Sequence, residues 1–199
     1  MKNVRAVVAE YERLKITERM VRGRRQKVEA GNVMVHGRPP YGYEKAKKDD
    51  KTSLAVNEEE AKVVRLIYQW YTTGDGGDGP LSMYAITKAL SEARIPTPGD
   101  KSPDIAKEQD YGQWNKSTVS RILEREAYCG VWYYGKCNGG RRNPDPELIP
   151  VDVPAIIERE TWEAAQRQRA KNAEMSTRNQ KHDYLLSRRL GENALGLLS

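Results

Sequence analysis

Hydrophobic residues recur at three- and four-residue steps through residues 2–30, and this pattern predicts one amphipathic helix. No proline interrupts the stretch, and Gly31-Asn32 supplies a stop signal. After Met20 the apolar stripe thins out, and basic residues fall around the helix. A solvated charged face is the simplest explanation. A narrow apolar stripe with a basic end is also typical of a helix that pairs with a partner and then lies against phosphates. The stripe comprises Val4, Val8, Tyr11 and Leu14.

Residues 37–43, Gly-Arg-Pro-Pro-Tyr-Gly-Tyr, can form neither a helix nor a central strand. Pro39 and Pro40 fix φ and lack N–H donors, whereas the two glycines permit close approach of the backbone to another group. An extended, thin segment with one arginine fits the narrow and electronegative minor groove of DNA. The simpler interpretation of these seven residues alone is a stiff linker whose tyrosines pack on the next domain.

The pattern beyond residue 52 has the features of a compact, mainly helical domain. Residues 54–56 predict one strand. Asn57 is expected to cap the helix that follows, with Glu60 reaching back to complete a capping box. Ser82 begins a second predicted helix and Asn115 caps a third, each with an apolar face.

The last third of the domain contains residues typical of strands. Residues 128–136 and 149–153 predict a hairpin whose long loop carries Arg141 and Arg142, and a closing helix follows that packs back on the domain. The expected fold class is therefore α+β and mainly α. It comprises a long N-terminal helix, a linker, and a helical, winged-helix-like DNA-binding domain with a β-hairpin.

The helix predicted after Asn115 carries small polar and basic residues on the side opposite its apolar face. Such a surface fits a recognition helix in a major groove, although any small polar helix of a helical domain would look the same. Roughly twenty residues separate it from the preceding helix, whereas a helix-turn-helix has three or four. The outward residues are Lys116, Ser117, Thr118, Ser120, Arg121 and Arg125.

Charge is unevenly distributed along the 199 residues, whose net charge is +6. Residues 1–48 carry 13 lysines and arginines against 5 glutamates, a net charge of +8, so the remainder carries −2. A basic N-terminal quarter indicates a polyanionic partner. No apolar run is long enough for a signal peptide or a membrane span, so no membrane partner is expected.

Cofactor and metal sites are not indicated. Cys129 and Cys137 are interpreted as ordinary strand residues, because a structural zinc site usually needs four ligands and both histidines lie far away in the sequence. The glycine-rich loop at residues 74–79 lacks the following Lys-Ser/Thr of a nucleotide site. We therefore expect no cofactor, no metal and no small-molecule substrate.

Two motifs resemble one protein family. Residues 12–31 have the spacing E-R-x-x-I-x-E-R, three residues, then G-R-x-x-x-x-x-A-G, which resembles the long helix that ends the catalytic domain of serine recombinases. Residues 37–43 resemble the G-x-P-P-Y-G-Y junction that opens the "recombinase" domain of large serine recombinases. The resemblance extends from about residue 10 to about residue 169, with Arg94 in a position where the family usually has glycine.

The resemblance implies a function in site-specific recombination, with double-stranded DNA as the partner. In that family a serine of an N-terminal domain attacks the DNA phosphodiester, and the whole protein assembles as a dimer and a synaptic tetramer. We expect this chain to be the DNA-binding middle of such a protein, without the serine domain or the zinc ribbon and with no catalytic residue of its own. The resemblance also implies a cytoplasmic, nucleoid-associated protein of bacterial or phage origin.

Candidate DNA-binding residues come from four regions. The basic end of the first helix is expected to contact phosphates, residues 37–43 to enter the minor groove, the helix after Asn115 to read the major groove, and the hairpin loop to touch the DNA backbone. The full set is Arg19, Arg22, Arg24, Arg25, Lys27, Gly37, Arg38, Pro39, Tyr41, Lys116, Ser117, Thr118, Arg121, Arg141 and Arg142.

The expected boundaries are a connecting helix at residues 1–36, a linker and domain entry at 37–56, the DNA-binding domain at 57–170, and a polar tail at 171–199. Two other functions remain open at this point. A winged-helix transcription regulator would explain residues 81–136 but not the spacing at residues 12–31. A dimerisation or interaction module without DNA binding would leave the charges merely solvating the surface.

Overall fold

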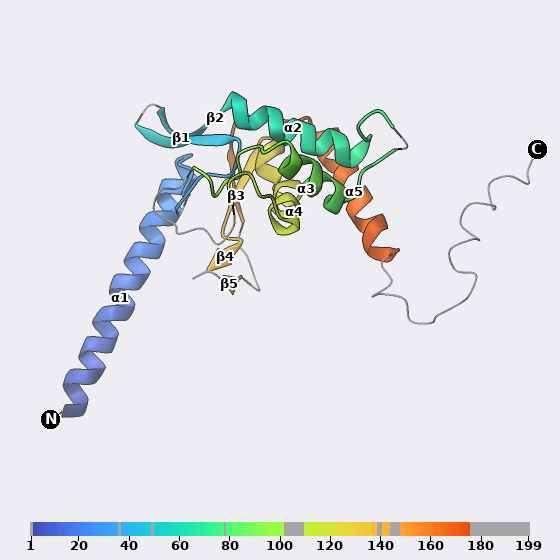
Figure 1. Ribbon diagram of the computed structural model, residues 1–199. Coiled ribbons are helices and arrows are strands. Elements are labelled where there is room, and N and C mark those ends of the chain that lie inside the picture. The colour runs from blue at the N-terminus through green and yellow to red at the C-terminus, as the bar shows by residue number, and fades with distance from the viewer. Residues whose placement is uncertain are drawn as a thin grey trace, which may run out of the picture.

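The computed structural model describes residues 2–35, 37–48, 50–77, 79–101, 110–138, 141–143 and 148–175. Within these residues the protein is mainly helical, with three two-stranded antiparallel sheets (Figure 1), and the predicted α+β class is confirmed. The elements in chain order are α1 (Lys2–Glu29), β1 (Tyr43–Lys48), β2 (Lys51–Val56), α2 (Glu58–Thr72), α3 (Met83–Glu92), α4 (Lys116–Glu124), the 3₁₀ helix η1 (Glu126–Cys129), β3 (Val131–Tyr134), β4 (Cys137–Asn138), β5 (Arg141–Arg142), β6 (Ile149–Asp152) and α5 (Arg159–Glu174).

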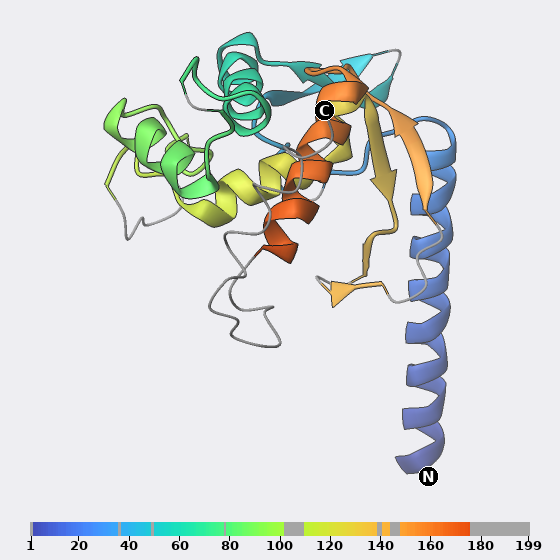
Figure 2. The same ribbon diagram turned by 90° about the vertical axis from the view of Figure 1, so that its right-hand side faces the viewer.

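Helix α1 extends away from the rest of the molecule, as Figures 1 and 2 both show. The predicted apolar stripe is exposed along most of the helix, and Tyr11 and Leu14 retain 57% and 64% of their accessible surface. Only near its C-terminal end does α1 join the core, through Val28, and this part of the helix contacts β6. None of the helices in the described part of the chain is long and apolar enough to cross a membrane.

A set of hydrogen bonds fastens the end of α1 to the β1–β2 hairpin. Gly31 has φ +88°, and the backbone amides of Gly31 and Asn32 donate to the carbonyls of Val28 and Lys27, the arrangement of a Schellman motif. The side-chain amide of Asn32 also donates to the Lys27 carbonyl at 2.9 Å. Its Oδ1 accepts from the amide of Thr52 at 2.9 Å. One asparagine side chain thus connects the helix to β2.

The predicted helix starts are confirmed by their caps. The side chains of Asn57, Ser82 and Asn115 accept hydrogen bonds from backbone amides in the first turns of α2, α3 and α4. The capping box expected for Glu60 is wrong. Its carboxylate faces the amide of Gly42 instead, and the amide of Asn57 donates to the Gly42 carbonyl.

The core lies where α2 contacts α3, α4 and α5. Aromatic packing there relies on tyrosine, because the sequence contains 11 tyrosines and no phenylalanine. Each buried hydroxyl must then find an acceptor. Tyr68 donates to the Ile122 carbonyl at 2.9 Å, and Tyr128 donates to the Tyr41 carbonyl at 2.8 Å. The fully buried residues include Val64, Ile67, Tyr68, Tyr71, Ile86, Leu90, Val119, Leu123 and Tyr128.

The strands differ from prediction in two places. The polar residues before residue 49 form β1, which pairs with β2 from Tyr43↔Val56 to Lys48↔Lys51, whereas the sequence predicted only the short apolar part of β2. Cys129 lies in η1 rather than in a strand, because Gly130 with φ +99° separates η1 from β3. Strands β3 and β6 pair as expected.

Arg94 adopts a left-handed conformation, with φ +49°, immediately after the C-cap of α3. Replacing Arg94 with glycine is expected to raise the free energy of unfolding by about 0.5–1 kcal/mol, because glycine avoids the Cβ penalty but costs more backbone entropy. Ala93→Gly is the matched control. Ala93 has φ −73°, so glycine there should destabilise by about 0.5–1 kcal/mol. Urea unfolding measures both, and a destabilising Arg94→Gly would contradict the strain argument.

Candidate nucleic-acid interface

Residues 37–43, here called the strap, cross the domain between α1 and β1. The tyrosines of the strap anchor it in the domain core, since Tyr41 is 7% and Tyr43 3% exposed. The Tyr43 hydroxyl lies 2.7 Å from the carbonyl oxygens of both Ala127 and Pro154, which share its one hydrogen as acceptors. The Tyr43 ring stacks on Tyr128 at a centroid distance of 5.8 Å. The strap is therefore part of the domain surface and not a free linker.

Arg38 and Gly37 lie on the exposed side of the strap, and Pro39 is half-buried. The Nη1 atom of Arg38 donates to the carbonyl of Pro98 at 3.3 Å. Gly37 has φ +78° and no atom within 4 Å of the position of a Cβ. The strap thus presents one guanidinium group beside an exposed stretch of backbone. Tyr41 does not share this exposure, so its ring supports the strap from inside the domain.

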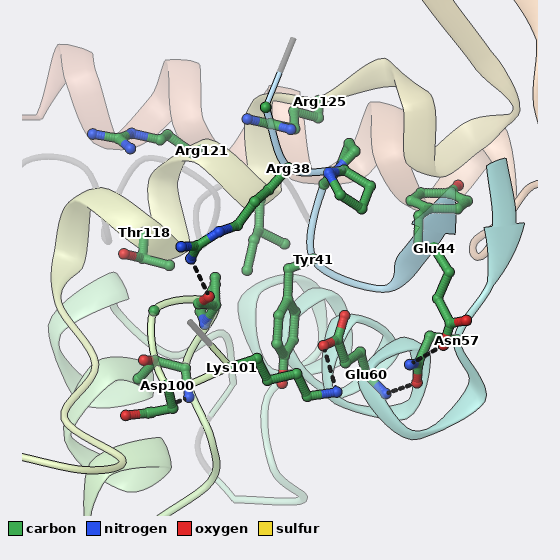
Figure 3. Close-up of a pocket in the computed structure, with 18 of the residues that line it drawn as sticks. Arg38, Tyr41, Glu44, Asn57, Glu60, Asp100, Lys101, Thr118, Arg121 and Arg125 are labelled. Atoms are coloured by element: carbon green, nitrogen blue, oxygen red, sulfur yellow. Dashed lines mark hydrogen bonds and ion pairs between the residues drawn. The ribbon is translucent and has the colours of Figure 1, made fainter. Parts of the chain in front are cut away.

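A groove of ≈ 1030 Å³ lies between the strap, residues 97–101 and α4. Figure 3 shows Arg38 reaching across it toward Thr118, with Arg121 and Arg125 on the α4 side. The fold thus brings two separately predicted regions together. Of the predicted site residues, the groove is lined by Gly37, Arg38, Pro39, Tyr41, Thr118 and Arg121.

Charges of both signs line the groove. The basic residues are Arg38, Lys45, Lys101, Arg121 and Arg125, and the acidic residues are Glu44, Glu60, Asp100 and Asp110. Three of the four carboxylates accept bonds from the protein itself. Glu44 accepts from the Asn57 side chain, and Asp100 from the amide of Thr97. Glu60 accepts from Gly42 and Lys101. These three carboxylates are therefore held by groups of the protein itself.

The N-terminal turn of α4 is ordered by its cap. The Asn115 side chain accepts from the hydroxyls of Ser117 and Thr118 as well as from the Thr118 amide. Lys116, Ser117 and Arg121 are exposed, and Thr118 is half-buried. Lys116 and Ser117 lie on α4 but outside the groove lining.

Of the predicted basic residues of α1, Arg24 is half-buried and the other four are exposed, and none of them lines the groove. Two of them form exposed ion pairs along the helix, Arg22 with Glu18 at 2.7 Å and Arg25 with Glu29 at 2.8 Å. Pairs of this kind contribute little to stability, so phosphates can compete for the arginines. The Nε atom of Arg24 donates to the Met20 carbonyl at 3.3 Å. Arg19 and Lys27 project from other parts of the same helix.

Arg141 and Arg142 have their backbone in β5, which pairs with β4 in the register Cys137↔Arg142 and Asn138↔Arg141. The prediction that these two arginines lie in a long loop is wrong, because they pair with β4 as a short strand. Only the backbone of these two arginines belongs to the described part of the structure. No group of His, Cys, Asp and Glu able to hold a metal ion occurs among the residues that the structure describes.

Sequence reasoning missed three basic residues of the groove. Arg125 follows α4 as its C-cap, Lys45 lies in the unpredicted strand β1, and Lys101 belongs to the polar stretch before α4. Arg125 could have been included from its outward position on the predicted helix. Nothing in the local sequence of Lys45 or Lys101 indicates that it lines the same groove as Arg38.

Comparison with known proteins identifies the family. The sequence model of the family described as Recombinase matches residues 58–172, which is more than half of the chain. The chain belongs to the Recombinase family. A Bacillus subtilis (strain 168) protein described as "Putative DNA recombinase" is 28% identical over 198 residues, which span 92% of this chain and 37% of that protein. This chain thus spans little more than a third of the relative's length, and the predicted membership of a recombinase family is confirmed.

One solved structure shows a similar fold. A structure described as the crystal structure of an LSR–DNA complex aligns with a TM-score of 0.52 at 23% sequence identity, covering 84% of this chain and 44% of that one. A second, described as concerned with the sequence requirements of the Listeria innocua prophage attP site, aligns with a TM-score of 0.49 at 22% identity, covering 84% of this chain and 58% of that one.

Proposed function

We propose that this chain is the DNA-binding region of a site-specific serine recombinase, and that it binds attachment-site or element-end duplex DNA beside the crossover point. One observation carries the proposal: Arg38 of the strap and Thr118 and Arg121 of α4 lie on one groove. A minor groove and the adjoining major groove of a duplex are separated by one phosphate backbone. A strap and a helix that share a groove are suited to reading both at once.

The proposed contacts have separable roles. Arg38 enters the minor groove, with Gly37 and Pro39 keeping the backbone thin at that point. Lys116, Ser117, Thr118 and Arg121 face the major groove or its phosphates. The basic side chains of α1 contact phosphates beside the crossover, and Arg141 and Arg142 of β5 contact the DNA backbone from the hairpin. The curated Bacillus subtilis relative and the LSR–DNA complex support DNA as the partner.

We also propose that the whole protein, of which this chain is a part, exchanges DNA strands and associates with further copies of itself. The exposed apolar side chains of α1, such as Tyr11 and Leu14, support pairing of this helix with a second copy. We assign no catalytic residue to the described part of this chain. Cutting and joining DNA would fall to the serine of a complete recombinase, as in the family that the motifs resemble.

DNA binding over a salt series, with random duplex compared to the ends of the parent element, tests the proposal. Arg121→Ala is expected to weaken binding to the element ends by about 1–3 kcal/mol and to leave random duplex nearly unchanged. Lys27→Ala should weaken both, and should lower the salt slope by about 0.9. Arg167→Ala is the matched control, because Arg167 is an exposed arginine of α5 outside the groove.

Other outcomes separate the alternatives. Equal weakening of both duplexes by Arg121→Ala would make this residue a phosphate contact and remove its role in base reading. Element-end binding in a complete protein without a serine-recombinase domain would favour the transcription regulator. Dimerisation without salt-sensitive DNA binding would overturn the DNA proposal and favour the interaction module.

A further inference from the structure

We propose that Glu60 and Lys101 are positioning residues for DNA recognition, which hold the strap, and Arg38 with it, against the connection between α3 and α4. The inference rests on the proposed function in one respect, namely that Arg38 contacts DNA. It adds two residues that do not themselves need to touch DNA. It also gives the α3–α4 connection a part in recognition.

The first support is the position of Glu60. Among the residues that the structure describes, it is the one charged side chain that is buried, with 8% of its surface exposed. One carboxylate oxygen accepts from the Gly42 amide at 2.6 Å, and the other pairs with Nζ of Lys101 at 2.8 Å. A buried carboxylate needs such partners to offset its lost hydration. Glu60 therefore joins the strap, α2 and the α3–α4 connection at one point.

The second support is that the strap rests on the same connection at two more points. The Tyr41 hydroxyl donates to the Pro96 carbonyl at 3.0 Å, and Arg38 itself donates to the Pro98 carbonyl at 3.3 Å. Trp114 completes the contact. Its ring meets the Tyr41 ring edge-on at 5.4 Å, and its Nε1 donates to the Ile95 carbonyl at 2.8 Å. A displaced connection would carry Arg38 with it.

The third support is that Thr97, Asp100 and Gly112 of this connection are hydrogen-bonded to one another. One carboxylate oxygen of Asp100 accepts from the amide of Thr97 at 2.6 Å and from the amide of Gly112 at 3.1 Å. The amide of Asp100 donates back to the Thr97 carbonyl at 3.0 Å. Lys101 follows directly on this turn. It therefore reaches Glu60 from a turn that hydrogen bonds hold in place.

These contacts explain how a short strap can present one arginine accurately. A loose strap would lose conformational freedom when DNA ordered it, and affinity would fall accordingly. A strap already fastened at Gly42, Tyr41 and Arg38 avoids that loss. Lys101 also neutralises a carboxylate that would otherwise face an approaching phosphate backbone.

The test combines DNA binding with amide hydrogen exchange in Lys101→Met, a change at a half-exposed side chain that leaves the bond between Glu60 and Gly42 in place. The probe is a duplex of about 30 base pairs with a central A-tract, whose narrow minor groove attracts arginine. Arg38→Ala is expected to weaken binding at least fivefold in the native protein and less than twofold in the Lys101→Met background. Exchange at residues 41–43 should be faster in Lys101→Met without DNA.

Lys88→Met is the matched control. Lys88 pairs with Glu92 across an exposed turn of α3 at 3.7 Å, so the substitution removes the same charge and one ion pair away from the strap. The Arg38→Ala effect and the exchange rates should remain native in this background. Glu60→Gln is a second variant, which keeps an oxygen acceptor for Gly42 and loses the ion pair. It should behave as Lys101→Met does.

The failures are distinguishable. An Arg38→Ala variant with native affinity for the A-tract duplex would overturn the proposed DNA contact of Arg38, and this inference with it. A clear Arg38→Ala effect that has the same size in the Lys101→Met background would overturn the positioning role alone. Unchanged exchange at residues 41–43 in both Lys101→Met and Glu60→Gln would likewise overturn the positioning role.

Discussion

Gly42→Ala is expected to destabilise the protein by about 2–5 kcal/mol, because a left-handed backbone conformation and close packing act together at this residue. Gly42 has φ +93°, and a Cβ there would lie 2.9 Å from Cδ1 of Ile156 and 3.2 Å from Cγ2 of Val64. Both neighbours are buried, so neither can move freely. The shift would also disturb the bond from the Gly42 amide to Glu60. Urea unfolding with a common slope measures the loss.

Gly37→Ala is the control from the same strap. Gly37 has φ +78°, but no atom lies within 4 Å of its Cβ position. Only the conformational penalty remains, and the expected loss is about 1–2 kcal/mol. Equal losses in the two variants would show that Ile156 and Val64 give way to the new methyl group, and that packing adds nothing to the requirement for glycine at Gly42.

The second large effect is expected at alkaline pH. Burial raises the pKa of Tyr68 and of Tyr128 above the ordinary value of 10.0. The unfolded chain therefore loses these protons first as the pH rises through 10, whereas the folded chain keeps them to a higher pH. The free energy of unfolding is therefore unaffected by these groups below pH 10. Above pH 10 it falls by about 1.4 kcal/mol per pH unit for each such tyrosine. Burial shifts the pKa of Tyr41 and Tyr43 in the same direction.

Ionisation of Tyr68 or Tyr128 also removes a hydrogen bond, because the ionised oxygen can no longer donate to the carbonyl of Ile122 or Tyr41. Ionisation and alkaline unfolding are therefore expected to occur together. Unfolding is expected within about two pH units above 10, given a total stability of roughly 5–15 kcal/mol. Tyrosinate absorbance and circular dichroism should then change together. Tyr68→Phe should make the decline less steep, whereas Tyr84→Phe, at a side chain that is 72% exposed, should not. Tyrosinate absorbance that rises well before the helices are lost would contradict this account.

The helices of the domain could be predicted because each carries its signals locally. Asn57, Ser82 and Asn115 cap their helices as expected, and the apolar face predicted for the helix after Asn115 is buried. Strand β1 could not be predicted in this way. Its residues 43–48 are mostly polar and basic, and their conformation depends on pairing with β2, which a local pattern does not reveal.

The candidate site could be proposed from the sequence in its parts but not in its assembly. Arg38 and Arg121 stand out from local chemistry, yet they are 83 positions apart and only the fold places them on one groove. Glu60 illustrates the opposite error. Its position in the first turn of a helix indicates a capping role, but the tertiary contact with Gly42 competes successfully for its carboxylate. The two interpretations of the strap also prove compatible, since its tyrosines pack inward while Arg38 remains exposed.

The fastening of α1 has a mechanical consequence. A helix of 28 residues is about 42 Å long at a rise of about 1.5 Å per residue. If its base turned by about 10°, the far end would swing by roughly 7 Å, more than one helical turn. Asn32 and the Schellman motif thus lie at the point about which α1 would rotate, and they fix its orientation. The position of the N-terminal end of α1 therefore depends on the Asn32 side-chain amide, which lies less than 3 Å from each of its hydrogen-bond partners.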